Sequence, residues 1–208
     1  TEMLREADTD FQRVETMITE STYGGRDDEQ TPRDEANKKF LSKVKQTLNK
    51  GGKVIVPVFA VGRSQEVLGL LADEMDRDYF DYPVYIDGMI RDVNALHTAY
   101  PEFLSKKVQK KVFEEENSPF LQDNIDTIGS HREREEVYDS GPGIILTTSG
   151  SLTGGPVLSY LQNLAEDVKN TMIFVGYQFD GSLGRKIQDG ADTVEINGDG
   201  VDVNLDTY

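Results

Sequence analysis

The sequence predicts an α/β fold, a doubly wound and mainly parallel sheet with helices on both faces. Five short apolar runs, rich in β-branched residues, have the length and composition of buried parallel strands. Helical patterns separate the runs, and such crossover connections join parallel strands. Three of the runs are followed by loops that combine glycine with hydroxyl or amide side chains. The predicted strands are residues 53–58, 84–87, 125–128, 143–147 and 171–175.

Helices are predicted before and between these strands. The first begins at Thr31 as its cap, with Pro32 at the first helical position, and it ends at Gly51 and Gly52. Apolar residues at helical spacing predict further helices over residues 64–77, 89–114, 132–138 and 156–166. These elements together make a doubly wound core over about residues 26–190.

The two ends of the chain differ from this core. Residues 14–20 predict a strand that runs into a turn at Tyr23, Gly24 and Gly25. Residues 192–196 and 201–205 predict a β-hairpin around residues 197–200 (NGDG). We expect these terminal strands to be edges of a sheet that belongs to another domain.

Composition limits the class of protein. With 208 residues, 37% of them hydrophobic, the chain can bury a core. No apolar run approaches the roughly 20 residues that span a bilayer, and no signal peptide is visible. The absence of cysteine excludes disulfides and thiolate metal sites. We therefore expect a soluble, cytoplasmic protein without a membrane partner.

The net charge of −16 taken alone argues against nucleic acid, because phosphate binding needs Lys and Arg. The acidic residues are spread along the chain instead of forming a tail. An acidic, Asp-rich surface suits very high salt, where self-repulsion is screened over a few ångströms. We hypothesise a salt-loving source, and the alternative is an ordinary acidic protein.

Candidate binding loops lie where ligands bind in open parallel sheets, beyond the carboxyl ends of strands. They are residues 59–66, 148–156 and 176–185. Glycine lets backbone N–H groups approach an anion, and the start of a helix adds positive potential. Arg63 and Arg185 are candidate two-pronged contacts to phosphate oxygens. The alternative interpretation is that any α/β protein needs glycine where a strand turns into a helix.

The residues offer no complete catalytic constellation. There is no G-x-x-x-x-G-K-[ST] loop, no G-x-G-x-x-G after the first strand and no nucleophile elbow. The two histidines, His97 and His131, form no H-x-H or H-E-x-x-H motif. We expect His97 to be a structural residue beside the core and His131 to be solvated. A basic cluster, expected to be a plain solvated helix face, comprises Lys106, Lys107, Lys110 and Lys111.

Five ordered motifs resemble those of one enzyme family and together cover nearly the whole chain. They are residues 20–24 (ESTYG), 57–66 (PVFAVGRSQE), 149–156 (SGSLTGGP), 175–178 (VGYQ) and 181–185 (GSLGR). Residues 86–87 (ID) and 97–102 (HTAYPE) add to the match. The chain resembles the β-CASP nucleases, and in particular the archaeal homologues of the cleavage and polyadenylation specificity factor.

This resemblance implies a two-domain, zinc-dependent ribonuclease. In the family, a metallo-β-lactamase-type domain holds two zinc ions through an H-x-H-x-D-H motif and further ligands. The β-CASP domain is inserted into it, and RNA lies in the cleft between them. A metal-bridged hydroxide attacks the phosphodiester bond in line. Members cut RNA endonucleolytically, and some also degrade it from the 5′ end.

Roles carry over by position. Glu20 occupies the family's first β-CASP motif, where a carboxylate orients a histidine of the catalytic centre. The domain boundaries implied are residues 1–25 for an edge of the metallo-β-lactamase-type domain, 26–190 for the β-CASP domain, and 191–208 for the return strands. The candidate RNA or phosphate contacts are Tyr23, Arg63, Ser64, Ser149, Gly150, Ser151, Thr153, Gly154, Gly155, Gln178 and Arg185.

The chain departs from the family by lacking H-x-H-x-D-H. We therefore expect the inserted domain alone, with no bound metal and no cleavage activity, while the parent enzyme holds two zinc ions. The expected partners are RNA, the missing domain of the same protein and a second copy of the parent. Two alternatives stay open, namely a stand-alone phosphate or nucleotide-binding module and a catalytically inactive interaction subunit. An intact Glu20 favours the ribonuclease over the inactive subunit.

Overall fold

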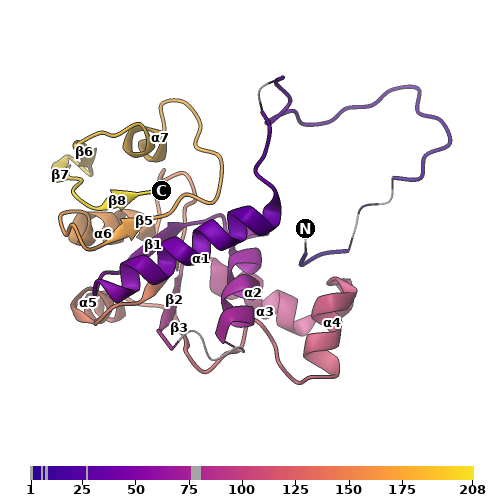
Figure 1. Ribbon diagram of the computed structural model, residues 1–208, viewed down its shortest axis with the longest axis horizontal. Helices are drawn as coiled ribbons and strands as arrows, with labels where there is room; N and C mark the ends of the chain where they lie inside the picture. Colours follow the sequence, from indigo (N-terminus) through magenta and orange to yellow (C-terminus); the bar gives the residue numbers. More distant parts are fainter. Residues whose placement is uncertain (1, 6, 8, 27, 76–80) are drawn as a thin grey trace.

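A six-stranded parallel sheet forms the centre of the molecule (Figure 1). The computed structural model describes residues 2–5, 7, 9–26, 28–75 and 81–208. The strand order is β3-β2-β4-β1-β5-β8. The strands are β1 (Val54–Pro57), β2 (Val84–Asp87), β3 (Ile125–Ile128), β4 (Ile144–Thr147), β5 (Thr171–Met172) and β8 (Asp206–Thr207). The predicted fold class is confirmed, since all five pairings in this sheet are parallel.

Helices cover both faces of the sheet. One face carries α1 (Arg33–Asn49), α2 (Arg63–Met75) and α3 (Ile90–Ala99), which share a buried apolar cluster with the strands. The other carries α5 (His131–Asp139), α6 (Pro156–Leu164) and α7 (Leu183–Gln188) over a second cluster. Alternation along β1 feeds both clusters, because Val54 and Val56 pack on the first face and Ile55 on the second.

Two of the predicted helices differ from the structure. The first helix begins at Arg33, so Pro32 is the residue before it, and Thr31 makes no cap. The pattern over residues 89–114 is broken into α3, the 3₁₀ turn η1 (Pro101–Phe103) and α4 (Lys106–Phe113). Proline disfavours helical geometry at Tyr100 before it, and the Ser105 side chain then caps α4. Residues 76 and 77, the expected end of α2, lie outside the described residues.

The C-terminal hairpin is confirmed with a tighter turn than predicted. It pairs β6 (Thr193–Ile196) with β7 (Asp199–Asp202) around Asn197 and Gly198, both at positive φ. Such Asn-Gly turns match the twist of hairpin strands. The hairpin packs its apolar side chains on the α6 and α7 face, and β8 then pairs with β5. The C-terminal segment thus packs against the main sheet, while its assignment to another domain stays a prediction.

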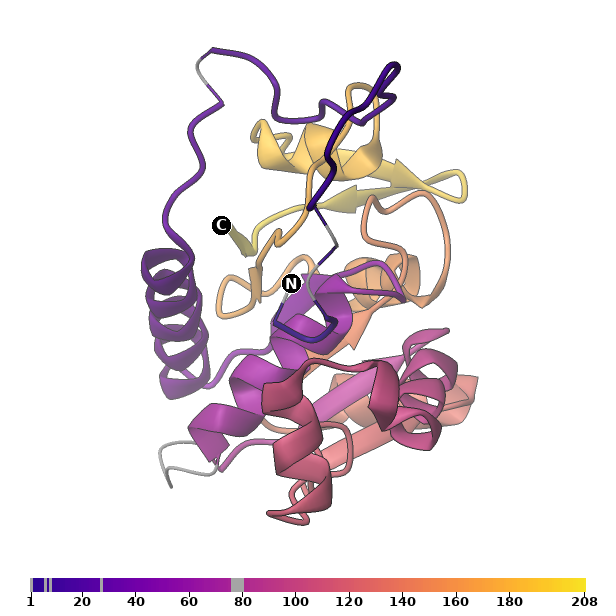
Figure 2. The same ribbon diagram turned by 90° about the vertical axis from the view of Figure 1, so that its right-hand side faces the viewer.

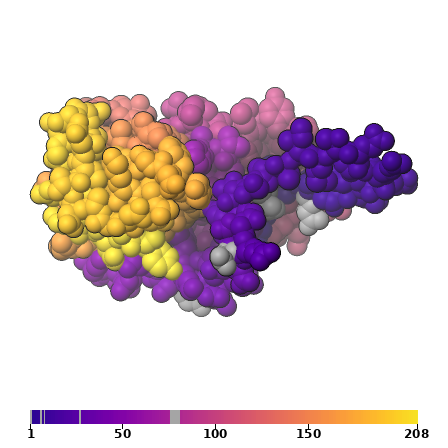
Figure 3. Space-filling model, turned by 90° about the horizontal axis from the view of Figure 1, so that it is seen from above, coloured from indigo at the N-terminus to yellow at the C-terminus, as the bar shows by residue number. Residues whose placement is uncertain are grey.

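The predicted strand over residues 14–20 is not formed in the structure. Its apolar side chains, such as Met17 and Ile18, are 64% and 95% exposed. The segment instead arcs away from the body of the molecule (Figures 1 and 2) and projects beyond it in Figure 3. Without a neighbouring strand, β-branched residues have nothing to pair with. Among the described residues no helix has the length and apolar character to cross a membrane.

Candidate nucleic-acid interface

The crevice of this sheet lies between β1 and β4, which are neighbours. The connection after β1 runs through α2 to β2 on one side, whereas the connection after β4 runs through α6 to β5 on the other. Ligands of open α/β sheets bind at such a reversal, beyond the carboxyl ends of the strands. The loops after β1, β4 and β5 all reach this edge, and we call them the first, second and third loops.

The first loop is closed by its own hydrogen bonds. Gly62 has a φ of +89°, and its N–H donates to Oε1 of Gln65 at 2.7 Å. The carbonyl oxygen of Ala60 accepts from Oγ of Ser64 at 2.8 Å and from Nε2 of Gln65 at 3.0 Å. Ser64 is fully buried, so its hydroxyl shapes the loop and does not face a ligand. Ser64 was expected to contact RNA, but in the structure it has no exposed surface.

Arg63 begins α2 and reaches into solvent from the same loop. Its Nη1 lies 2.6 Å from Oε2 of Glu66, one turn along the helix. The other carboxylate oxygen of Glu66 lies 3.3 Å from Nη2 of Arg33, at the start of α1. The Arg63 side chain is half exposed. Glu66 therefore orients the Arg63 guanidinium, and the remaining N–H donors of Arg63 stay available to a ligand.

The second loop is a compact turn built around Ser149. Its Oγ accepts from the backbone N–H of Thr153 at 3.0 Å, and its own N–H donates to the carbonyl of Gly154 at 3.1 Å. Gly155 has a φ of +83°, and a Cβ there would lie 2.7 Å from the carbonyl oxygen of Thr148. Ser151 is buried, whereas Thr153 is exposed. The turn needs glycine for geometry and presents Thr153 outward.

The three loops touch one another. A Cβ on Gly150 would lie 2.9 Å from the backbone nitrogen of Phe59, so only glycine allows the second loop to approach the first. Gln178, from the third loop, is 2% exposed and donates from Nε2 to the carbonyl of Gly150 at 2.8 Å. Within the described residues its Oε1 has no hydrogen-bond partner. Gln178 is a buried link between loops and not a surface contact.

The N-terminal segment reaches the third loop through aromatic contact. The ring of Tyr23 packs edge-to-face on Tyr177, with centroids 6.1 Å apart. Glu20 is exposed, and its Oε2 accepts from the N–H of Thr22 at 2.8 Å. That backbone hydrogen bond lowers the pKa of Glu20, so the carboxylate is ionised at neutral pH.

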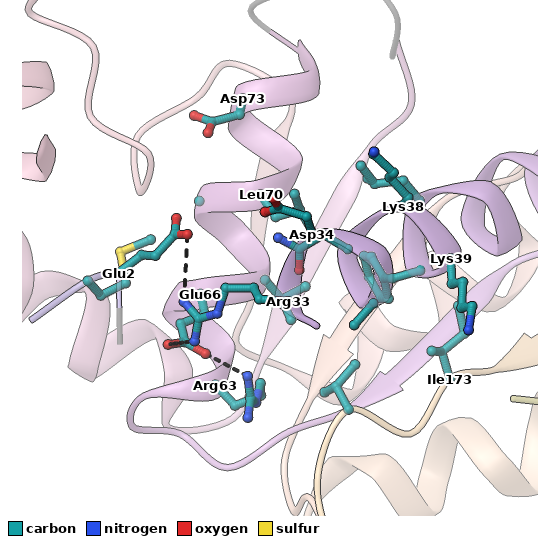
Figure 4. A pocket seen from close by; sticks show the side chains of 18 of the residues that line it. Glu2, Arg33, Asp34, Lys38, Lys39, Arg63, Glu66, Leu70, Asp73 and Ile173 are labelled. Carbon is teal, nitrogen blue, oxygen red and sulfur yellow. Dashed lines mark hydrogen bonds and ion pairs between the residues drawn. The ribbon is translucent and has the colours of Figure 1, made fainter. Parts of the chain in front are cut away.

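Arg185 does not join Arg63. It lies on α7, and its Nε donates to Oδ2 of Asp189 one turn along at 2.9 Å, which raises its pKa further. Arg63 and Tyr23 instead line a groove of about 960 Å³ between α1, α2 and the third loop (Figure 4). Thr153 lines a separate hollow of about 360 Å³ with Ser182 and the third loop. Of the predicted contacts, only Tyr23 and Arg63 line the groove and only Thr153 lines the hollow, whereas the others, including Arg185, line neither.

The groove is rich in basic side chains for so acidic a chain. Its basic residues are Arg33, Lys38, Lys39, Arg63, Lys107 and Lys111, and its acidic residues are Glu2, Asp34, Glu66, Asp73 and Glu74. This balance of six to five contrasts with the net charge of −16 for the whole chain. A polyanion is repelled less here than over the molecule as a whole.

An ion pair that was not predicted from the sequence lies at the carboxyl end of β2, next to the second loop. Asp87, at the carboxyl end of β2, is 1% exposed and accepts from Nε and Nη2 of Arg134 at 2.6 and 3.1 Å. Tyr160 donates its hydroxyl to the same carboxylate at 2.9 Å, and burial raises the pKa of that tyrosine. The N–H of Thr148 lies 3.4 Å from the carbonyl oxygen of Asp87. The only sign of this ion pair in the sequence was an acidic residue, Asp87, at the end of a predicted buried strand.

The two histidines serve local structure. Nδ1 of His97 lies 2.8 Å from the carbonyl oxygen of Val93, and its ring packs on Phe120. His131 is 74% exposed and lies 3.5 Å from Glu135, as expected of a surface residue. In the part of the chain that the structure describes, no three His, Asp or Glu side chains gather as metal ligands do.

The comparisons with known proteins agree on one family. The sequence profile of the Beta-Casp domain matches residues 64–187. Over 99% of its length the chain is 48% identical to the transcription termination factor FttA of Methanocaldococcus jannaschii. It is 44% identical to the FttA of Thermococcus kodakarensis over 100% of its length, and 46% identical to that of a Lokiarchaeum species over 90%. The chain spans 33%, 33% and 30% of these relatives, about a third of each.

Proposed function

The chain belongs to the Beta-Casp family, and we propose that it is the RNA-binding domain of a longer protein that hydrolyses phosphodiester bonds with zinc. In this proposal the zinc ions are held by residues of the longer protein, and among the residues described here no three His, Asp or Glu side chains lie together as ligands. The names of the relatives suggest which process this activity serves. Because these relatives are named transcription termination factors, we propose that the RNA is a transcript still being made and that its cleavage contributes to termination.

One observation carries the RNA-binding role. Three glycine-containing loops meet where the strand order reverses. Arg63 lies at the same edge and lines a groove that has more basic than acidic side chains. Backbone N–H groups, hydroxyls and guanidinium groups are the donors that bind phosphate oxygens without reading base sequence. Exposed rings of Phe59 and Tyr177 beside them offer surfaces on which bases stack.

Glu20 is proposed as a positioning residue. It is ionised and exposed, and it lies three residues before Tyr23, whose ring contacts the third loop. A carboxylate in that place can accept the N–H of a metal-bound histidine and hold the imidazole in one orientation. Glu20 would then act through the histidine and contact no substrate.

Photo-crosslinking to RNA tests the binding role. Single-stranded RNA irradiated with the chain should crosslink to Tyr23, Phe59 and Tyr177, which surround the loop edge. Phe113 is a matched control, because it is 62% exposed on α4 and its side chain lines neither hollow. Peptide mapping that finds equal crosslinking at Phe113 and at the loop aromatics would reject a specific RNA edge.

Cleavage assays test the enzymatic part. The chain alone, incubated with RNA and zinc, should produce no cuts above a heat-treated control, whereas the longer protein should cut. Activity that stays with the repurified chain would place a complete site in these residues. A longer protein that binds RNA and leaves it intact would instead identify a non-catalytic interaction subunit.

A further inference from the structure

An alternating series of charges runs through the groove between α1 and α2. Glu66 lies between Arg63 and Arg33, with N–O distances of 2.6 and 3.3 Å. Arg33 also lies 3.7 Å from Glu2, which in turn lies 3.5 Å from Lys107. The series continues from Lys107 through Asp73 to Lys111. Figure 4 shows the Glu2, Arg33, Glu66 and Arg63 part of it, with its ion pairs dashed.

Cations outnumber acids in this series, because every acid is shared by two cations and cations occupy both ends. The acid that fixes the two arginines, Glu66, is only 13% exposed, whereas the side chains of Arg33 and Arg63 are 44% and 50% exposed. Each guanidinium has five N–H donors, so most remain free for a second acceptor. The carboxylate is thus an internal anchor and the arginines face outward.

Such anchoring matters for binding. A free arginine loses rotamer freedom when it grips a ligand, whereas one already held by a carboxylate loses less. The two guanidinium groups, one from α1 and one from α2, can each form a forked contact with phosphate oxygens. Carboxylate-bearing ligands have the same charge, but an RNA strand supplies phosphates in succession along the groove.

We propose that Arg33 and Arg63, held by Glu66, form a two-arginine clamp for the phosphate backbone of single-stranded RNA. This inference rests on the proposed function. It adds that α1 also contacts the RNA and that the RNA continues from the loops into the groove. Arg33 becomes an RNA-binding residue although it lies outside all three loops. Lys107 and Lys111 extend the basic lining along the same path.

The test combines spectroscopy with affinity. In the labelled chain, the Nε–Hε signals of Arg33 and Arg63 should both shift when short single-stranded RNA is added. A methylphosphonate analogue of the same sequence, whose backbone is uncharged, should leave them in place. Arg33→Ala should weaken RNA binding on the order of tenfold, as loss of one charge-assisted contact does. Arg33→Lys, which keeps the charge but not the fork, should fall between.

Arg132→Ala is the matched control, because it removes the same charge from an 87% exposed side chain on α5. If Arg33→Ala and Arg132→Ala change RNA affinity equally while Arg63→Ala weakens it, the clamp is rejected and the proposed function stands. If none of the three changes affinity, both are rejected. Equal shifts with the uncharged analogue would also overturn the clamp. Circular dichroism of Arg33→Lys shows whether the fold is retained.

Discussion

The two edges of the main sheet contrast in how they use polar groups. At the amino edge, Asn170 accepts from the N–H of Lys53 at 2.7 Å and donates to the carbonyl of Leu164 at 2.9 Å. Nζ of Lys53 donates to the carbonyl of Ser140 at 2.5 Å. Burial lowers the pKa of Lys53 there. At the carboxyl edge, Arg63 and Thr153 instead keep donors exposed to solvent.

The contrast shows at which edge of the sheet polar groups are available to bind a ligand. Buried polar groups must find partners inside the protein, and the amino edge satisfies them within a closed network. Helix α2 begins at the carboxyl edge, and the first N–H groups of a helix have no intrahelical acceptor. The variants below should therefore divide into those that change stability alone and those that change RNA binding.

The largest effect on stability is expected at the Asp87–Arg134 ion pair, at the carboxyl end of β2. Asp87→Asn keeps the shape but leaves the Arg134 guanidinium without its buried counter-charge, so unfolding free energy should fall by about 3 kcal/mol or more. Asp189→Asn removes the same charge from the exposed pair with Arg185, so its effect on unfolding free energy should be much smaller. Urea denaturation of both variants measures the difference. Equal midpoints would show that the Asp87 pair contributes little.

Two buried amides offer a direct comparison of the edges. Asn170→Ala should lower unfolding free energy by about 2 kcal/mol, because it leaves a buried N–H and a buried carbonyl unpaired. RNA affinity of the folded variant should not change. Gln178→Ala should weaken RNA binding, because it unties the second loop from the third at Gly150. Affinity loss in Asn170→Ala, measured well below its melting temperature, would contradict the division between edges.

Glu20→Gln tests the positioning role in the longer protein. It keeps the shape and removes the charge that would orient a histidine, so single-turnover cleavage should slow by roughly tenfold to a hundredfold. RNA affinity and melting temperature should stay close to those of the parent, since Glu20 is exposed here. A parallel loss of affinity would assign Glu20 to RNA binding instead.

Arg63→Ala should produce the smallest change of the series. RNA dissociation constants should rise on the order of tenfold, and the slope of log affinity against log salt should flatten by about 0.7, as for one phosphate contact to a single strand. Arg185→Ala is the control, because Arg185 pairs with Asp189 and lines neither hollow. Titrations over a salt series separate the two. Identical slopes for both variants would remove Arg63 from the interface.

Sequence reasoning was reliable where local rules apply. Apolar runs located five of the six strands of the main sheet, all except β8, and Asn197 with Gly198 located the hairpin turn. It was wrong for the strand over residues 14–20, because β-branched residues form strands only beside a partner strand. It also treated Arg63 and Arg185 as equivalent, since both follow glycine-containing loops near a predicted helix start.

By itself, the sequence determined the α/β class, the ordered loop motifs and the acidic surface, because these depend on residue type and short spacing. Only the tertiary structure decided the rest. It inserted β4 between β2 and β1, which creates the crevice, and it brought Arg33 across to Glu66 and Arg134 across to Asp87. Those contacts join residues 33 and 47 positions apart. Pairings at such separation depend on how helices cross the sheet, which local propensity does not specify.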